Sequence, residues 1–227
     1  MTTAIICAMQ EEMQPLYEIL QLSETKIIGS HEFHLGKIED HDVILTTSGI
    51  GKVAAAITAT VAISVLGAKR LINTGSAGWV SLKDASIGEI VVADKLAYND
   101  VNLTNFGYEM GELPDCPRFF ITDEFLADAA FGCQQVKSHR GTIVSGDAFV
   151  CTKEQSDKIR TDFPEALACE MEGAAIAQTA FKFNIPFVVI RSISDGANSG
   201  STVTFNEFLP IAAKNAAAVT KHVLAKI

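Results

Sequence analysis

The amino-acid sequence predicts an α/β sandwich, in which helices cover both faces of one β-sheet. Strand-like and helix-like stretches alternate along all 227 residues, as they do in layered α/β proteins. The stretches ICAM and FVVIRS are almost wholly apolar, which is typical of strands buried on both faces. No linker or change of composition divides the chain, so we expect a single domain over residues 1–227.

The first part of the chain is predicted to contain a strand, a helix, a hairpin and a second helix. EEMQPLYEIL repeats apolar residues at helical spacing, and KVAAAITATVAISVLG is apolar nearly all round, which indicates a buried helix. The hairpin is expected to turn near Glu39 and Asp40. In order, these elements are a strand at 3–9, a helix at 11–20, a hairpin at 32–49 and a helix at 52–67.

The rest of the chain continues this alternation. One long loop interrupts it, because residues 101–119 contain aromatics, glycines and prolines without any period. Two helices are expected to stop near Pro164 and Pro186. The predicted elements are strands at 69–78 and 88–100, a helix at 123–133, a strand and turn at 140–150, a helix at 153–164, a strand at 166–172, a helix at 173–186, a strand at 186–198 and a helix at 204–227.

Composition excludes several classes of protein. The formal net charge is −9 and no run of Lys or Arg occurs, which argues against binding of nucleic acid. No segment has the roughly 18 consecutive apolar residues of a membrane helix, and the N-terminus lacks the basic region of a signal peptide. The five cysteines show no CxxC spacing. We therefore expect reduced thiols in the cytoplasm and no metal site.

Polar residues follow five of the predicted strands, where ligands bind in open α/β sheets. The polar strand ends lie at residues 9–12, 48–51, 74–78, 145–147 and 192–195. We expect four carboxylates, with Arg191 nearby, to face one pocket: Glu12, Glu170, Glu172 and Asp195.

Structural roles remain open for each of these carboxylates. Glu12 and Glu172 could be first-turn helix acids, Asp195 a turn or cap residue, and Glu170 an ion-pair partner of Arg191.

The stretch GIGKVA, at residues 49–54, has a rival interpretation. It matches the G-x-G-x-x-A fingerprint of dinucleotide binding. That fingerprint requires an acidic residue near the end of the next strand, where this chain has Asn73, Thr74 and Gly75. We therefore expect no nicotinamide cofactor.

Six motifs carry a resemblance to a known family. In order along the chain they are AMQEEM, NTGSAG, FGYEMGELP, SGDAFV, EMEGAAIA and FVVIRSISD. Together they resemble the 5′-methylthioadenosine/S-adenosylhomocysteine nucleosidases of the nucleoside phosphorylase/hydrolase superfamily. The resemblance implies a three-layer sandwich with a central mixed β-sheet flanked by helices, a homodimer and no cofactor. It also implies hydrolysis of the N-glycosidic bond of 5′-thioadenosines and of 5′-deoxyadenosine, releasing adenine and the sugar in methionine salvage.

The resemblance further implies roles for individual residues. Glu12 would activate water, and Asp195, oriented by Ser194, would protonate N7 of the leaving adenine. The other expected positions are Met171 and Glu172 at the ribose hydroxyls, Phe149 and Val150 at adenine, Ser76 and Arg191 beside Glu12, Met9, Ile50 and Phe205 along the ribose and 5′ side, Ala77, Gly78 and Glu170 elsewhere in the pocket, and Leu103, Phe106 and Pro114 in the partner subunit's pocket.

These residue types suit glycosidic cleavage by water. Breaking the C–N bond leaves a cation-like ribosyl group and an adenine anion, so a proton donor at N7 and carboxylates at the sugar both help. A phosphate nucleophile would require several cations, yet of five arginines only Arg191 lies in a site motif, and Glu11 and Glu12 would repel it.

Two further questions concern catalysis and the substrate's tail. Storage proteins of the same superfamily would be expected to lose the acid or the base, whereas Glu12 and Asp195 are both present. Cys7, Trp79 and the stretch DGANSGSTVTF depart from the family pattern and leave the preference for the 5′ substituent open.

Overall fold

The computed structural model describes residues 1–198 and 201–227. Residues 199 and 200, in the stretch DGANSGSTVTF, lie outside the described part. The strands are β1 (Thr3–Cys7), β2 (Gln21–Ile28), β3 (His31–Ile38), β4 (His41–Thr47), β5 (Arg70–Trp79), β6 (Ile90–Tyr98), β7 (Phe120–Ile121), β8 (Ser138–Ser145), β9 (Ala166–Glu170) and β10 (Phe187–Asp195). The helices are α1 (Gln10–Tyr17), α2 (Lys52–Ser64), α3 (Glu124–Phe131), α4 (Lys153–Asp162), α5 (Gly173–Phe183) and α6 (Ser201–Leu224), with a 3₁₀ turn at Thr104–Phe106.

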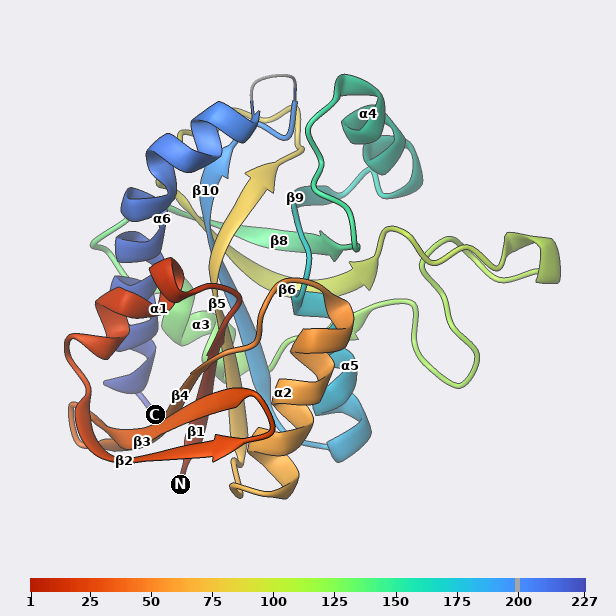
Figure 1. The fold of residues 1–227 in the computed structure, drawn as a ribbon. Coiled ribbons are helices and arrows are strands. Elements are labelled where there is room, and N and C mark those ends of the chain that lie inside the picture. The colour runs from red at the N-terminus through yellow and green to blue at the C-terminus, as the bar shows by residue number, and fades with distance from the viewer. Residues whose placement is uncertain (199–200) are drawn as a thin grey trace.

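The described strands form one mixed sheet, as expected (Figure 1). Its order is β10-β6-β8-β9-β5-β1-β4-β3-β2. Strand β5 pairs with β1 and β10 in parallel and with β9 in antiparallel orientation. Because β10 also pairs with β6, strands β5, β10, β6, β8 and β9 close into a small barrel. The central sheet is thus partly rolled, which the expected sandwich did not include.

Helices cover the sheet on two sides (Figure 1). On one side α1, α3 and α6 pack together, and their apolar residues form a core with β1, β4, β6 and β10. On the other side α2 packs against α5, and these helices bury alanines against β1, β5 and β6. A third core lies beside α4 and contains Ile159, Phe163 and Ala197. No described helix combines the length and the apolar character that crossing a bilayer requires.

Most element predictions are confirmed, and two strands were missed, the edge strand β2 and the two-residue strand β7, which pairs with β6. The hairpin turns at Glu39 and Asp40, between β3 and β4, and residues 101–119 form a loop that projects from the molecule (Figure 1). Strand β2 was not expected. Its side chains are mostly exposed, because it lies at the edge of the sheet, so its sequence lacks the apolar alternation that marks a half-buried strand.

Candidate active site

A cavity of about 330 Å³ opens where β5 and β10 end, beside the starts of α1 and α5. Every residue predicted for this subunit's own pocket lines it. Three further residues also line it: Ala8, Ala148 and Cys169. Each of the three is next in sequence to a predicted residue or motif, but none has a side chain whose chemistry would have marked it.

Glu12 is fixed by four donors at the start of α1. Its Oε2 accepts hydrogen bonds from the amides of Ala8 and Met9, at 3.0 and 3.3 Å. Its Oε1 accepts from the amide and hydroxyl of Ser76, at 2.8 and 2.7 Å. The Met9 bond is the helix-capping role considered for this residue, and the Ser76 bonds tie the same carboxylate to β5. A Cβ on Gly75 would lie 2.6 Å from Oε1, so glycine is required for this approach.

Asp195 ends β10 and is held through both carboxylate oxygens. The Ser194 hydroxyl donates to Oδ2 at 2.9 Å, and the Ala197 amide donates to Oδ1 at 2.8 Å. Asp195 is only 2% exposed and pairs with Gly78 of β5 across a register shift. A Cβ on Gly78 would lie 3.1 Å from Oδ1, so this carboxylate also packs closely on β5.

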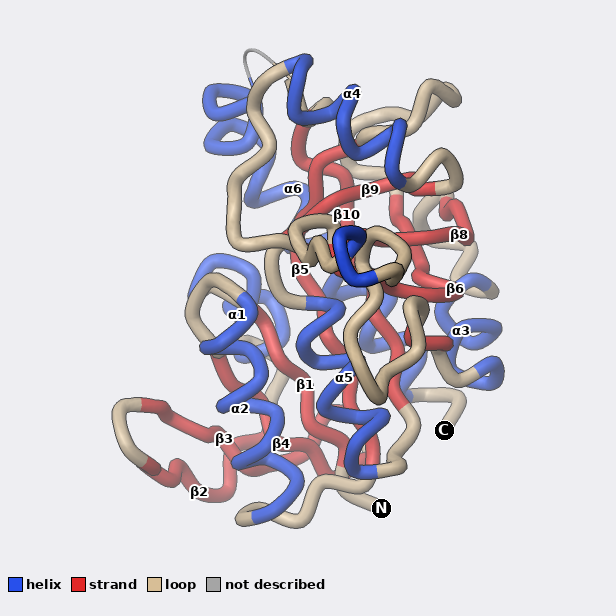
Figure 2. Tube along the Cα trace, turned by 90° about the vertical axis from the view of Figure 1, so that its right-hand side faces the viewer, coloured by secondary structure: helices blue, strands red, loops and turns tan. Residues whose placement is uncertain are grey.

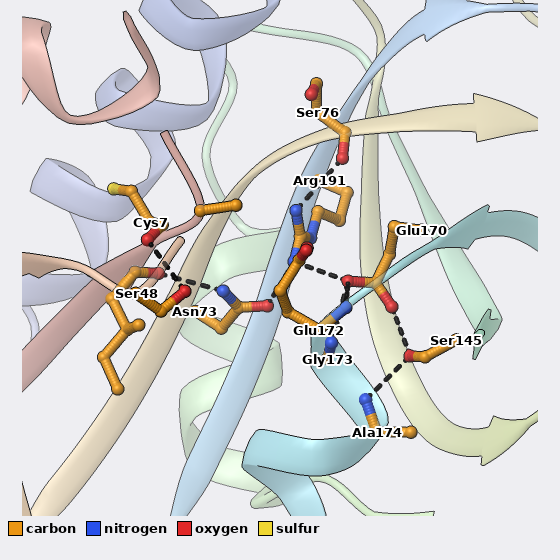
Figure 3. Close-up of polar contacts among 12 residues, drawn as sticks. Cys7, Ser48, Asn73, Ser76, Ser145, Glu170, Glu172, Gly173, Ala174 and Arg191 are labelled. Carbon is orange, nitrogen blue, oxygen red and sulfur yellow. Dashed lines mark hydrogen bonds and ion pairs between the residues drawn. The ribbon is translucent and has the colours of Figure 1, made fainter. Parts of the chain in front are cut away.

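Arg191 lies fully buried between two glutamates (Figure 3). Its Nη2 contacts Glu170 Oε2 at 2.5 Å and Glu172 Oε2 at 3.3 Å. It also donates to Asn73 Oδ1 at 2.6 Å and to the Ser76 carbonyl at 3.1 Å. The expected pair of Glu170 and Arg191 is therefore present. Arg191 makes no hydrogen bond to Glu12, because the four donors above already surround that carboxylate.

Glu170 is tied into the protein on all sides. Besides Arg191, it accepts from the Ser145 hydroxyl and from the amides of Glu172 and Gly173, at 2.9 and 2.7 Å for the amides. These amides begin α5, whose positive end favours a carboxylate. Ser145 in turn accepts from the Ala174 amide at 2.7 Å (Figure 3). Glu170 therefore organises the start of α5 and leaves Glu172 directed at the cavity.

Glu172 has fewer donors than its neighbours. Its Oε1 accepts from the Gly51 amide at 2.8 Å. Burial raises the pKa of Glu172 to about 7, and the carboxylates of Glu170 and Glu12 act in the same direction. The Arg191 guanidinium and the Gly51 amide oppose this rise. A carboxylate with so few protein donors has capacity left to accept hydrogen bonds from ligand hydroxyls.

Aromatic and apolar side chains also line the cavity. The rings of Phe149 and Phe205 are 5.8 Å apart between centroids and meet edge to face at 74°. Phe149 is 40% exposed, and Val150 and Met171 are half-buried. Burial raises the pKa of the Cys169 thiol, so this lining residue stays protonated. The cavity thus has an acidic polar end and an apolar mouth, a combination suited to a polar ligand with a flat apolar part.

The glycine loop before α2 does not offer a phosphate site. The Gly51 amide donates to Glu172 and the Lys52 amide donates to Asp147, both at 2.8 Å. Two carboxylates thus occupy the helix N-terminus that a pyrophosphate would need. This geometry argues against the dinucleotide interpretation of GIGKVA.

The three residues predicted for a partner's pocket lie away from this one. Leu103, Phe106 and Pro114 belong to the projecting loop, and Phe106 is 78% exposed. Within residues 1–198 and 201–227, no group of three His, Cys, Asp or Glu side chains could hold a metal ion.

The carboxylates of Glu12 and Asp195 contact the same strand, β5, at neighbouring positions. Glu12 is bonded to Ser76 and Asp195 packs on Gly78, two residues further along β5. Residues two apart in a strand point to the same face, so both carboxylates meet β5 at the wall of the same cavity.

Comparisons with known proteins agree with this geometry. Residues 2–225 match the model of the phosphorylase superfamily. A 5′-methylthioadenosine/S-adenosylhomocysteine nucleosidase of Tolumonas auensis is 42% identical over the full length of both chains. The Neisseria meningitidis nucleosidase of the same name, in complex with methylthio-immucillin-A, has a TM-score of 0.96 and 37% identity, covering 100% of this chain and 99% of that one. The Colwellia psychrerythraea nucleosidase, in complex with adenine, has a TM-score of 0.95 and 40% identity, covering 100% and 95%.

Proposed function

Because this chain belongs to the 5′-methylthioadenosine/S-adenosylhomocysteine nucleosidase family of the phosphorylase superfamily, we propose that it hydrolyses the N-glycosidic bond of these nucleosides. The products are adenine and the 5-thioribose derivative, and 5′-deoxyadenosine is a further candidate substrate. The observation that carries the proposal is that Glu12, from α1, and Asp195, from β10, both lie against β5 and line the same pocket.

In the proposed mechanism, Asp195 and Glu12 act on opposite sides of the bond. Asp195 transfers a proton to N7 as the bond between C1′ and N9 breaks, and the bonding electrons leave with adenine. Glu12 accepts a proton from water, whose oxygen bonds to the cationic C1′. Asp195 then regains a proton from solvent and Glu12 releases one, so one water is consumed. Ser194, which donates to Asp195 at 2.9 Å, orients the acid.

The remaining pocket residues suit the parts of such a substrate. Glu172, a carboxylate with few protein donors, would accept hydrogen bonds from the ribose hydroxyls, and Met171 lies next to it. Phe149 and Val150 offer an aromatic face and a backbone edge to adenine. Met9, Ile50 and Phe205 provide an apolar surface for the 5′ thioether.

Water suits this pocket better than phosphate as the nucleophile. Glu12 already accepts hydrogen bonds from the amide and hydroxyl of Ser76 and from the amides of Ala8 and Met9. These donors are therefore not available to an anion, and the carboxylate itself would repel one. Arg191 is engaged with Glu170 and Glu172, and its buried Nε has no partner among the described residues.

A homodimer is also proposed, with the projecting loop of one subunit capping the partner's pocket. Leu103, Phe106 and Pro114 would supply that cap. Figure 2 faces the side that carries this loop, with α2 and α5 below it. Exposed apolar side chains on these helices include Val53 and Phe181, 70 and 48% exposed. Exposed apolar side chains that gather on one surface are typical of a protein interface.

All five cysteines are free thiols, which supports a reducing compartment such as the cytoplasm.

Reaction in ¹⁸O-labelled water tests the proposed function. We expect adenine to be released from 5′-methylthioadenosine, with the label in the sugar product and no effect of added phosphate. S-adenosylhomocysteine, 5′-deoxyadenosine and aminofutalosine, tested in parallel, establish the substrate range. A sugar 1-phosphate product, or a strict requirement for phosphate, would replace hydrolysis by phosphorolysis.

A further inference from the structure

Two substrate-facing segments meet at the N-terminus of α2. The Gly51 amide, directly before the helix, donates to Glu172 Oε1 at 2.8 Å. The next amide, that of Lys52, donates to Asp147 Oδ1 at 2.8 Å. Asp147 immediately precedes the pocket-lining segment that contains Phe149. Successive amides of one helix therefore hold a carboxylate from the ribose side and a carboxylate from the adenine side.

Asp147 is fixed in turn by charged neighbours. Its own amide donates to Asp100 Oδ2 at 2.8 Å, and the Lys52 ammonium contacts Asp100 at 2.7 Å and Asp147 at 3.7 Å. The side chains of Lys52, Asp100 and Asp147 are 21, 32 and 48% exposed. Ion pairs this accessible contribute little to stability. The bond from Asp147 to the helix amide is therefore the feature that distinguishes it from a solvated surface acid.

The backbone at this junction leaves little freedom. Gly51 has a φ of +99°, and a Cβ there would lie 3.1 Å from Asp147 Oδ1. Displacing Asp147 would therefore release the Lys52 amide and change the direction of the adjoining Gly51 amide. The Gly51 amide is one of the groups that lower the pKa of Glu172 against the effect of burial. A change at Asp147 would reach Glu172 through two consecutive peptide units, which are joined at the Gly51 Cα.

We propose that Asp147 is a positioning residue, which fixes the first amides of α2 and so couples the adenine-side segment to the ribose-side carboxylate of Glu172. This inference rests on the function proposed above, because it takes Phe149 and Glu172 as the residues that contact the two halves of the substrate. Asp147 itself touches neither half. It acts by keeping Phe149 and Glu172 in fixed positions relative to each other.

The test compares Asp147→Ala with Asp147→Asn. Alanine removes the acceptor, whereas asparagine keeps an oxygen for the Lys52 amide and loses the charge. We expect Asp147→Ala to lower kcat/KM for 5′-methylthioadenosine about 10- to 100-fold, the scale of a small misplacement in an active site. Asp147→Asn should recover most of this loss.

Two readouts separate positioning from simple stabilisation. The acidic limb of the kcat/KM profile depends on Glu172 and the groups that face it, which are Glu12, Glu170 and Arg191. It should move to higher pH in Asp147→Ala and stay in place in Asp147→Asn. Hydrogen exchange of the peptide that contains Gly51 should accelerate in the alanine variant alone.

Asp123 provides a matched control. It caps α3, accepting from the Leu126 amide at 3.0 Å, and does not line the pocket. Asp123→Ala should lower Tm and leave kcat/KM and its acidic limb unchanged.

Three results would overturn the proposal. They are unchanged kcat/KM in Asp147→Ala, an equal loss in Asp147→Asn, and a lower Tm with an unmoved acidic limb. A parent protein that releases no adenine would instead overturn the proposed function, and this inference with it, before any variant is compared.

Discussion

Three buried glutamates line the cavity, and the protein holds each of them differently. Glu12 accepts from four donors on two segments, and Glu170 accepts from Arg191, Ser145 and the start of α5. Glu172 has one amide at 2.8 Å and a longer contact to Arg191. The first two are therefore fixed by the protein, whereas the third depends most on what enters the pocket.

The pH dependence of activity should report Glu172. Burial raises its pKa from 4.5 to about 7, so the ionised form that would accept ribose hydroxyls is lost below neutrality. We expect kcat/KM to fall as pH drops below about 7, approaching tenfold per unit. A profile measured between pH 5 and 8.5 checks this, and a flat profile would contradict it.

The same group should affect stability in the opposite direction. Between pH 4.5 and about 7 the folded protein binds this proton and the unfolded chain does not. The contribution of Glu172 to the free energy of unfolding is therefore full below pH 4.5 and is lost as pH rises to about 7. Glu172→Gln should remove this part of the slope. Identical slopes for the variant and the parent would show that other groups cause it.

At the scale of elements, β5 positions both proposed catalytic carboxylates. Ser76 donates twice to Glu12, while Gly75 and Gly78 allow Glu12 and Asp195 to approach the backbone. The two carboxylates thus pack against the backbone of the motif NTGSAG. Its glycines are required because a side chain at either position would crowd a carboxylate.

Gly75→Ala should test this role of β5. The added methyl group would lie 2.6 Å from Glu12 Oε1 and would displace the carboxylate. We expect kcat to fall about 100-fold or more, because a displacement near 1 Å can have this effect. Gly141→Ala is the control, since its Cβ would be equally crowded, 2.6 Å from Leu167 Cδ1, but outside the pocket. Equal losses of activity in both variants would contradict the assignment.

Much of this arrangement could be predicted from the sequence, for identifiable reasons. Apolar runs marked β1 and β10, and polar residues at their ends marked Glu12 and Asp195. Strand β2 could not be found, because an exposed edge strand has no buried face to pattern its sequence. The ion pairs of Arg191 with both Glu170 and Glu172 were also only partly predictable. It depends on side-chain directions that are set when β5, β9 and β10 close into the barrel.

At the scale of the whole molecule, the projecting loop packs its base against the protein and exposes an aromatic side chain at its tip. Phe106 is 78% exposed and lies outside its own pocket. Arg118 anchors the base of this loop, donating to the Met110 carbonyl at 2.9 Å and lying over the rings of Phe119 and Phe163. An anchored base with an apolar tip suits a loop that docks on a second copy of the chain.

Phe106→Ala should separate capping from dimer formation. If Phe106 caps the partner's pocket, the variant should remain a dimer in sedimentation and raise KM about tenfold, equivalent to roughly 1.4 kcal/mol of lost contact. Phe125→Ala is a suitable control, because Phe125 is also exposed, at 59%, but lies on α3 at the other side of the sheet. A parent protein that is fully active as a monomer would contradict the capping role.

The central claim is that Asp195 protonates the leaving base while Glu12 activates water. The measurement that tests it most directly is the rate ratio of Asp195→Asn to the parent on two nucleosides, one that releases adenine and one with an activated leaving group. With adenine leaving, we expect kcat to fall about 10²–10⁴-fold and KM to change little, because asparagine can bind N7 but cannot transfer a proton. With the activated leaving group, which needs no proton, the loss should be far smaller. An equal loss on both substrates would show that Asp195 only positions the substrate.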